Sequence, residues 1–379
     1  MSNTTAVHAG EPNPRISGAV VMPIFQSSTY LYEDETDYHA ARYVRLSNSP
    51  NHEVLHRKLA ALENAEAALV AASGMAAIST SLLAMLNADD HLLVLDCPYG
   101  GTRGFIVEDL PRFGISYTFI DPNDPRDWES KLTPKTRAIY VETITNPLMQ
   151  VPDLEAVVEF ARSNDLLSMV DNTFASPINF RPAEHGFDLS LHSCTKYLNG
   201  HSDIAAGAVI GRTVLVEKVR RLLNHLGGSL DPHACYLLQR GIKTIGLRIR
   251  QQNQSALAIA RFLEDHTSVK SLNYPGLPSH PAHERARTLF DGFGGMLSFE
   301  LAGGAPAARR FLKRLKIPLV AVSLGGVESL IILPAVTAYA NVPAPERKRL
   351  GVTDGLIRLS VGIEETQDLI DDIRQALSE

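Results

Sequence analysis

Hydrophobic and polar positions change in regular blocks along residues 51–211. Apolar residues at helical spacing over 53–62 predict a helix, and the continuous apolar run 67–72 predicts a strand. Further strands are expected at 91–95, 115–120, 137–142, 166–171 and 187–192. Helices are expected at 76–86 and from Pro152, placed in a first helical turn, to about Ser163. Strands that alternate with helices predict an α/β fold with a mostly parallel, doubly wound sheet.

The pattern changes after about residue 231. A long helix is expected at 237–266, and shorter helices near 306–315 and 364–377. Strands are expected at 269–274, 295–301, 319–323, 330–333 and 355–361. We therefore predict an α/β domain over residues 51–235 and a smaller C-terminal α+β domain with an antiparallel sheet over 236–379.

Residues 1–50 have several prolines and no long periodic segment. A segment of this length is expected to be an arm that wraps a neighbouring subunit, although a frayed terminus is the simpler alternative. The first 18 residues are polar and do not resemble a signal peptide. No apolar run approaches the ~20 residues that a membrane-spanning helix needs, so a cytoplasmic protein is expected.

Composition narrows the possible partners. The 379 residues carry a net charge of -6, which argues against binding to nucleic acid or to an acidic membrane surface. Three widely spaced cysteines favour reduced thiols over a disulfide framework. They lack metal-ligand spacing, so no metal site is expected.

The most informative stretch is Ser193-Cys-Thr-Lys196, which follows the apolar run 187–192. A lysine buried at a strand end is costly unless its amine has a chemical role, and Schiff-base formation is the commonest such role. Ser193 and Thr195 could bind the phosphate of a cofactor. We therefore predict that Lys196 carries pyridoxal 5'-phosphate.

Three other sites at strand ends agree with this prediction. Asp171 ends the strand 166–171 and could keep the cofactor's ring nitrogen protonated, although an aspartate at a strand end is, taken alone, more often a helix cap or a turn former. Ser73-Gly74-Met75 opens a helix, where free N–H groups favour an anion, or where Ser73 is a simple N-cap. Tyr99 follows a strand and could stack on a planar ring or merely pack. Ligands bind beyond the carboxyl ends of strands in such folds.

Arg358 alternates with apolar residues in the strand 355–361. An arginine in this setting either faces solvent or binds a carboxylate bidentately, and an amino-acid substrate would supply that carboxylate. No P-loop, dinucleotide fingerprint, nucleophile elbow or H-E-x-x-H motif competes with this interpretation.

Several motifs together resemble the Cys/Met-metabolism family of pyridoxal-phosphate enzymes, which includes cystathionine γ-synthase, cystathionine γ- and β-lyases and methionine γ-lyase. The resemblance extends from about Val7 to the C-terminus. The motifs are Ser73-Gly-Met-Ala-Ala77, Tyr99-Gly-Gly-Thr102, Val170-Asp-Asn-Thr-Phe174, Ser193-Cys-Thr-Lys-Tyr-Leu-Asn-Gly-His-Ser-Asp203, Gly292-Phe-Gly-Gly-Met-Leu-Ser-Phe299, Ser323-Leu-Gly-Gly-Val-Glu-Ser329 and Ile357-Arg-Leu-Ser-Val-Gly-Ile363.

The resemblance implies a fold-type-I enzyme that assembles as a homotetramer of two intimate dimers and acts on a small amino-acid substrate. It also implies a role for each matching residue. Lys196 would be the Schiff-base lysine and move protons, Asp171 would pair with the ring nitrogen, and Tyr99 would stack on the ring and assist proton transfer. Gly74, Met75, Ser193 and Thr195 would hold the phosphate, Tyr43 and Arg45 would reach the neighbouring subunit's phosphate, and Asn146, Ser323 and Arg358 would bind the substrate carboxylate.

Departures from the family pattern fall where the far end of the substrate would bind. Val322 stands where a glutamate is frequent, Gly101 where methionine γ-lyases tend to have cysteine, and the segment 333–339 lacks the usual Thr-His or Ser-His. Residues 46–51 also vary from the usual motif. We expect γ-elimination on cystathionine-like amino acids. The alternatives are γ-replacement on an O-acylhomoserine, cystathionine β-lyase or methionine γ-lyase activity, and, from a different class, a cofactor-free scaffold.

Overall fold

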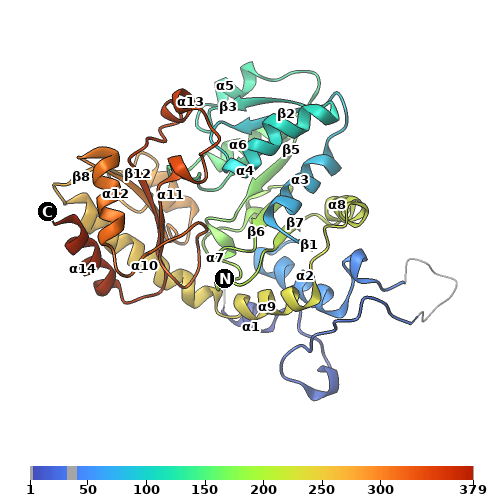
Figure 1. Ribbon diagram of the computed structural model, residues 1–379. Coiled ribbons are helices and arrows are strands. Elements are labelled where there is room, and N and C mark those ends of the chain that lie inside the picture. Colours follow the sequence, from blue (N-terminus) through green and yellow to red (C-terminus); the bar gives the residue numbers. More distant parts are fainter. Residues whose placement is uncertain (1–2, 32–40, 379) are drawn as a thin grey trace.

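The computed structural model describes residues 3–31 and 41–378, which form two layered units side by side (Figure 1). The larger unit contains a seven-stranded sheet in the order β1-β7-β6-β5-β4-β2-β3. Strands β6, β5, β4, β2 and β3 run parallel, and β7 runs antiparallel to both of its neighbours. The strands are β1 Ala67–Ala71, β2 His91–Leu95, β3 Ser116–Ile120, β4 Thr136–Glu142, β5 Leu167–Asp171, β6 Leu189–Ser193 and β7 Gly207–Gly211.

The helices of this unit follow from caps that the sequence supplies. Ser49 accepts a hydrogen bond from the His52 backbone N–H and Pro50 occupies the first turn of α2, and Asp153 caps α6 in the same way. Helix α6 contacts β4 and β5, whereas α3 and α8 contact β7. The helices are α2 Pro50–Glu63, α3 Gly74–Met85, α4 Gly100–Gly104, α5 Pro125–Ser130, α6 Leu154–Ser163, α7 Ser176–Asn179 and α8 Thr213–Leu226.

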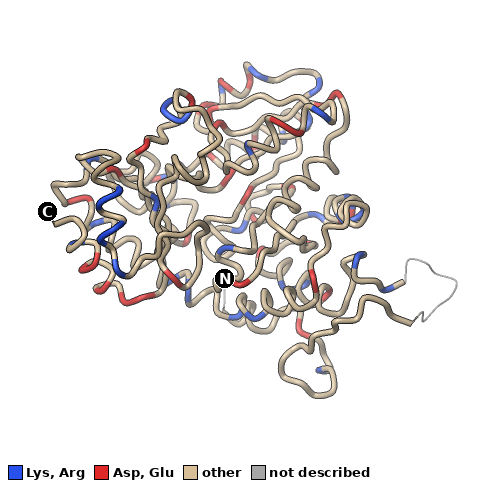
Figure 2. The backbone as a smooth tube through the Cα atoms, in the orientation of Figure 1, with Lys and Arg blue, Asp and Glu red and all other residues tan. Residues whose placement is uncertain are grey.

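The smaller unit has a five-stranded sheet in the order β10-β11-β12-β9-β8. Two helices, α9 Pro232–Ile242 and α10 Ile245–Glu264, link it to the first unit. Its strands are β8 Val269–Asn273, β9 Met296–Leu301, β10 Leu319–Val320, β11 Leu330–Ile332 and β12 Leu356–Ser360, and its helices are α11 His283–Leu289, α12 Gly304–Arg314, α13 Ala344–Arg349 and α14 Thr366–Leu377. Figure 2 shows Lys and Arg residues interspersed with Asp and Glu residues over both units.

The structure corrects three details of the predicted elements. The helix expected at 237–266 is two helices, α9 and α10, which are separated by Lys243 and Thr244. Pro152 precedes the Asp153 cap and lies outside α6. The second sheet is not wholly antiparallel, since β10 pairs with β11 in parallel. The residue boundaries of the two predicted domains stay a prediction.

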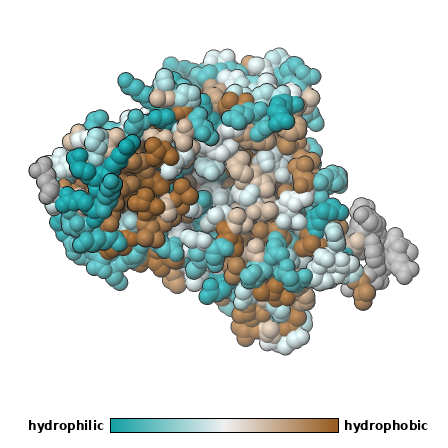
Figure 3. Space-filling view, viewed as in Figure 1, coloured by the Kyte–Doolittle hydropathy of each residue, from teal (hydrophilic) through white to brown (hydrophobic). Residues whose placement is uncertain are grey.

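The N-terminal arm divides into two parts. Helix α1, Asn3–His8, packs on its own chain, where the buried Lys58 amine donates to the carbonyls of Ala6 and Val7. The following segment protrudes and exposes large apolar side chains, with Val20 80% and Leu31 94% exposed. Figure 3 shows hydrophobic surface on this protruding part of the molecule. The rest of the predicted arm at 1–2 and 32–40 lies outside the described residues.

Two large apolar clusters form the cores of the two sheets. A small third cluster, formed by Cys97, Tyr339, Leu350, Val352 and Leu356, joins the loop after β2 to the C-terminal segment. In the part of the chain that the structure describes, no helix is long and apolar enough to cross a membrane. The cytoplasmic location remains a prediction.

Candidate active site

A cavity of about 460 Å³ lies where the carboxyl ends of β4, β5 and β6 face the second sheet. This is the edge at which ligands bind in open α/β sheets. Most of the residues singled out in the sequence meet here. Those that line the cavity are Gly74, Met75, Tyr99, Asn146, Asp171, Ser193, Thr195, Lys196, Ser323 and Arg358.

Lys196 lies just beyond the end of β6, in a turn held by a hydrogen bond from its own N–H to the Ser193 carbonyl. Its amine donates to Ser323 Oγ over 2.8 Å. Burial, assisted by the positive charge of Arg358, lowers the pKa of Lys196 to about 8. At this pKa about a tenth of the amine is neutral at pH 7 and about half at pH 8, and the neutral amine is the form that attacks a carbonyl carbon.

Asp171 is the buried last residue of β5, and its carboxylate accepts the Thr173 backbone N–H over 2.9 Å. Glu142 ends β4 directly beside it in the register of the two strands, and accepts the Tyr99 backbone N–H over 2.5 Å. Burial raises the pKa of both carboxyl groups, and the Asp171 charge raises the pKa of Glu142 further. The cavity thus contains a buried carboxyl pair that favours a cationic or N–H partner.

The N-terminus of α3 opens into the cavity. Ser73 caps the helix by accepting the Ala76 N–H over 3.0 Å, and Gly74 begins it. A Cβ on Gly74 would lie 2.7 Å from the Ser193 Cβ, so only glycine allows this approach. The free N–H groups of the first helical turn and the Ser193 hydroxyl form a site suited to an anion. The Thr195 hydroxyl lines the cavity but exchanges hydrogen bonds with the Ala206 backbone.

Arg358, on β12, is 5% exposed and points its guanidinium at the opposite wall. It donates to Asn146 Oδ1 over 3.1 Å and to the Ser323 carbonyl over 2.9 Å. Ser323 adopts a φ of +89°, a conformation that costs a non-glycine residue about 1–3 kcal/mol and that is concentrated at functional sites. Burial lowers the pKa of Arg358 to about 10, yet the group stays charged at neutral pH. The solvated-face alternative for Arg358 is therefore wrong.

Two predicted residues do not reach this cavity. Arg45 donates to the Asn224 carbonyl over 3.0 Å and its guanidinium lies over the Tyr43 ring, so both side chains sit on the outside of the described part of the same chain. Gly101 does not line the cavity either, whereas Val322 does and is 68% exposed.

Sequence reasoning missed several residues of the site. Glu142 is the clearest, and it carried a usable signal because it ends a predicted strand at the same edge as Asp171. Ile144, Thr173, Phe174, Leu324, Ile332, Thr337 and Ala338 also line the cavity. Ile332 ends β11, and the others come from loops whose positions depend on tertiary packing.

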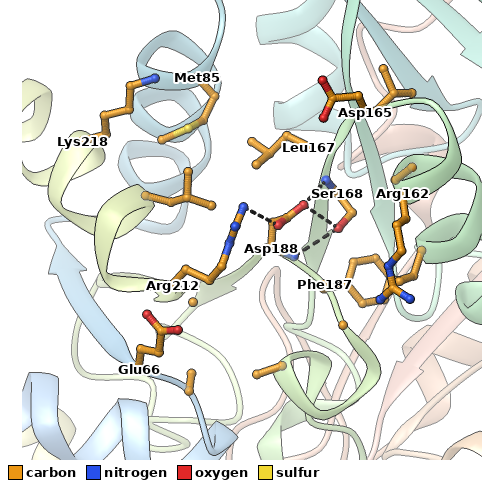
Figure 4. A pocket seen from close by; sticks show the side chains of 18 of the residues that line it. Glu66, Met85, Arg162, Asp165, Leu167, Ser168, Phe187, Asp188, Arg212 and Lys218 are labelled. Carbon is orange, nitrogen blue, oxygen red and sulfur yellow. Dashed lines mark hydrogen bonds and ion pairs between the residues drawn. The ribbon is translucent and has the colours of Figure 1, made fainter.

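A second hollow of about 660 Å³ lies at the opposite end of the parallel strands (Figure 4). Its carboxylate Asp188 is already paired with Arg212 at 2.6 Å and accepts two hydrogen bonds from Ser168. Its lysine, Lys218, is exposed on α8. The second hollow therefore has an exposed lysine and a carboxylate that is already paired, and it lacks the buried amine that the first cavity has.

The first cavity fits pyridoxal phosphate on its own geometry. It combines the buried Lys196 amine, whose pKa is lowered, with the buried Asp171 carboxyl group. It also contains the N-terminus of α3, where Gly74 has no side chain to block an anion. Within the described residues, no group of three or more His, Cys, Asp or Glu side chains could hold a metal ion. The fold and the cavity together are those of a fold-type-I pyridoxal-phosphate-dependent enzyme.

Comparison with known proteins identifies the family. The model of the family "Cys/Met metabolism PLP-dependent enzyme" matches residues 3–378, and the chain belongs to this family. The chain is 44% identical to a cystathionine γ-lyase of Bacillus subtilis, covering 99% of this chain and 98% of that protein. It is 40% identical to the chloroplastic cystathionine γ-synthase 1 of Arabidopsis thaliana, covering 98% and 68%. The crystal structure of cystathionine γ-lyase from Lactobacillus plantarum complexed with L-serine has a TM-score of 0.94 and 38% identity, covering 99% of this chain and 98% of that one.

Proposed function

We propose that this enzyme is a carbon–sulfur lyase that carries out γ-elimination on cystathionine-like amino acids through a Schiff base on Lys196. The observation that carries the proposal is the Lys196 amine, which faces the same cavity as Asp171 and Arg358 and hydrogen-bonds to Ser323. The chain's similarity to cystathionine γ-lyase over nearly its whole length supports this reaction. Similarity to a γ-synthase at 40% identity keeps γ-replacement on an O-acylhomoserine as the second candidate.

Each wall of the cavity would then have one task. The α3 N-terminus with Gly74, Met75, Ser193 and Thr195 would hold the phosphate, and Asp171 would keep the ring nitrogen protonated. The bound cofactor supplies an electron sink for the negative charge that develops at the substrate's α-carbon. Tyr99, which is 43% exposed at the mouth, would stack on the ring and assist proton transfer.

The remaining polar residues would act on the amino acid. Arg358, Asn146 and Ser323 would bind the α-carboxylate, which fixes the α-carbon near the lysine. The neutral Lys196 amine would remove the α-proton and pass it to the bound cofactor, and would then remove a β-proton, because γ-elimination breaks a β-carbon–hydrogen bond as well. Protonated Lys196 would give that proton to the sulfur as the γ-carbon–sulfur bond breaks and the thiol leaves. Its hydrogen bond to Ser323 holds the amine near both positions.

The far end of the cavity bears on the choice of substrate. Val322, Phe174, Leu324 and Ile332 give it an apolar lining, and the charged residues among those described as lining the cavity are Glu142, Asp171, Lys196 and Arg358. These four belong to the cofactor and carboxylate regions. Whether the bound substrate undergoes elimination or replacement therefore depends on the shape of the cavity and on the access of water, rather than on a charged contact with the departing group.

Two incubations test the proposal. With L-cystathionine alone, the lyase releases ammonia and 2-oxobutyrate, whereas a synthase forms cystathionine efficiently from an O-acylhomoserine and cysteine. Efficient synthesis in the second incubation with little 2-oxobutyrate in the first would reverse the choice. A Lys196→Ala variant that retains full activity would overturn the lysine mechanism, and colourless protein that does not react with borohydride would favour the scaffold alternative.

We also propose that the enzyme is a homotetramer of two intimate dimers, in which Tyr43 and Arg45 reach the phosphate of the neighbouring subunit. The exposed apolar side chains at 20–31 and the position of Arg45 outside its own cavity support this proposal. Replacing Arg45 with Ala should weaken cofactor retention at least about tenfold, since it removes a charge-assisted contact. A stable, active monomer in sedimentation analysis would refute this role.

A further inference from the structure

Tyr339 is a fully buried tyrosine in the segment that follows η7, Pro334–Val336, and it lies outside the cavity itself. Its hydroxyl oxygen lies 2.7 Å from the Asn146 carbonyl oxygen, 3.2 Å from the Pro98 carbonyl oxygen and 3.2 Å from Cys97 Sγ. Asn146 contacts Arg358, and Pro98 immediately precedes Tyr99. The Tyr339 hydroxyl thus contacts backbone carbonyls at two places in the site, one at Asn146, which binds Arg358, and one at Pro98, which precedes Tyr99.

The direction of these hydrogen bonds follows from protonation. Burial raises the pKa of the Tyr339 hydroxyl, and burial raises the pKa of the Cys97 thiol to about 11. Both groups therefore keep their protons at neutral pH. The thiol can donate to the Tyr339 oxygen, and the single hydroxyl proton goes to the nearer acceptor, the Asn146 carbonyl.

The segment that carries Tyr339 is packed tightly against the cavity. Thr337 and Ala338 line the cavity directly before the tyrosine. A Cβ on Gly100 would lie 2.2 Å from the Ala338 carbonyl oxygen, so this loop and the turn after Tyr99 fit only because residue 100 is glycine. The Tyr339 hydroxyl consequently cannot move away without displacing the loop that lines the site.

We propose that Tyr339 is a positioning residue for substrate recognition: its hydroxyl holds the Asn146 backbone so that Asn146 Oδ1 orients the Arg358 guanidinium toward the α-carboxylate. The inference rests on the proposed role of Arg358. The Tyr339 hydroxyl acts through two other residues, so its loss should weaken binding of carboxylate-bearing ligands while the proton-transfer groups stay in place. A purely structural tyrosine would lower stability without this selectivity.

The test compares Tyr339→Phe with Tyr274→Phe in the cofactor-loaded enzyme. Tyr274 is a matched control, because it is also fully buried and its hydroxyl bonds to the Gly294 and Asn253 carbonyls, away from the cavity. Dissociation constants for L-alanine and L-alaninamide, which differ in the carboxylate, are measured from the change in the visible spectrum. Thermal midpoints of both variants are recorded alongside kcat and KM.

We expect Tyr339→Phe to raise the dissociation constant for L-alanine about tenfold, the effect of one well-placed hydrogen bond, and to change that for L-alaninamide less than about twofold. KM should rise with little change in kcat. Tyr274→Phe should lower the thermal midpoint to a similar extent but leave both dissociation constants unchanged. Equal weakening of both ligands, or the same selectivity in Tyr274→Phe, would overturn the inference.

Failure of the proposed function gives a different result. The comparison of L-alanine with L-alaninamide does not depend on which γ-substituent is cleaved. If Tyr339→Phe weakens the binding of L-alanine but not of L-alaninamide, and the wild-type enzyme forms no 2-oxobutyrate, only the lyase assignment is overturned. If Tyr339→Phe binds both ligands as the wild-type enzyme does, and the wild-type enzyme forms 2-oxobutyrate, only the positioning role is overturned.

Discussion

Replacing Arg358 with Met should sharply reduce catalysis without reducing the stability of the fold. Arg358 is buried, and none of the ion pairs among the described residues involves it. Burial lowers its pKa to about 10, which corresponds to about 3 kcal/mol of unfavourable free energy for keeping the charge in the folded protein. The unfolded chain binds this proton more tightly, so the full cost applies at every pH below about 10.

The substitution also removes two hydrogen bonds, to Asn146 Oδ1 and to the Ser323 carbonyl. Both residues line the cavity, where water can replace the lost donor, so each bond is worth only about 1 kcal/mol. Relief of the buried charge therefore offsets their loss. We expect the thermal midpoint of Arg358→Met to be unchanged or up to about 3 °C higher. The two charge-assisted bonds that we propose Arg358 makes to the substrate carboxylate would be lost at the same time, so kcat/KM should fall roughly 10²–10⁴-fold.

Arg248→Met is the matched control. Burial also lowers the pKa of Arg248 to about 10, but its guanidinium donates to the carbonyls of Tyr197, Leu198 and Gly241. Removing it leaves these buried acceptors without a donor, at about 1–3 kcal/mol each, so the thermal midpoint should fall by several degrees. Differential scanning calorimetry and steady-state kinetics measure both effects. If Arg358→Met melts as early as Arg248→Met and keeps its KM, the functional interpretation of Arg358 is wrong.

Two further predictions concern the charges at the floor of the cavity. Because burial and Arg358 lower the pKa of Lys196 to about 8, apo-protein should capture pyridoxal phosphate faster as the pH rises and reach a plateau above about pH 8. Rapid mixing followed by visible absorption measures this rate, and a rate independent of pH from about 6.5 to 9.5 would contradict a titrating amine. Asp171→Asn should reduce kcat at least about 10²-fold and leave the thermal midpoint within about 2 °C, since burial raises the pKa of this carboxyl group and the amide still accepts the Thr173 N–H. Wild-type activity in Asp171→Asn would show that the ring nitrogen needs no carboxylate partner here.

The sequence predicted the parts of the site that depend on strand ends. Lys196 and Asp171 follow apolar runs, and parallel strands bring their carboxyl ends to one edge, so neighbouring positions in space follow from the pattern alone. The position of Gly74 at the cavity follows from the same reasoning, because helix α3 begins at Gly74 shortly after β1 ends. The family resemblance then supplied the cofactor and the class of reaction, which the family model confirms.

The rest depends on contacts between residues far apart in the chain. Arg358 meets Asn146 across 212 positions, and Tyr339 meets the same residue across 193. Neither contact has a local signal, because β12 and the preceding loop could present these side chains to solvent with the same alternation of polar and apolar residues. The break between α9 and α10 at Lys243 and Thr244 was also missed, because no proline marks it in the sequence.

The ionisable residues of the cavity are arranged to pair with charges on a ligand rather than with one another. Burial lowers the pKa of Lys196 and Arg358 and raises that of Asp171 and Glu142. None of these four charges forms an ion pair with another among the described residues, and the Lys196 amine contacts the neutral Ser323 hydroxyl. Such an arrangement costs stability, as functional sites commonly do. A cationic ring nitrogen beside Asp171 and an anionic carboxylate beside Arg358 would each stabilise the charged form that burial disfavours. We therefore propose that the same positions that weaken the fold favour the binding of a zwitterionic amino acid together with a phosphorylated pyridine cofactor.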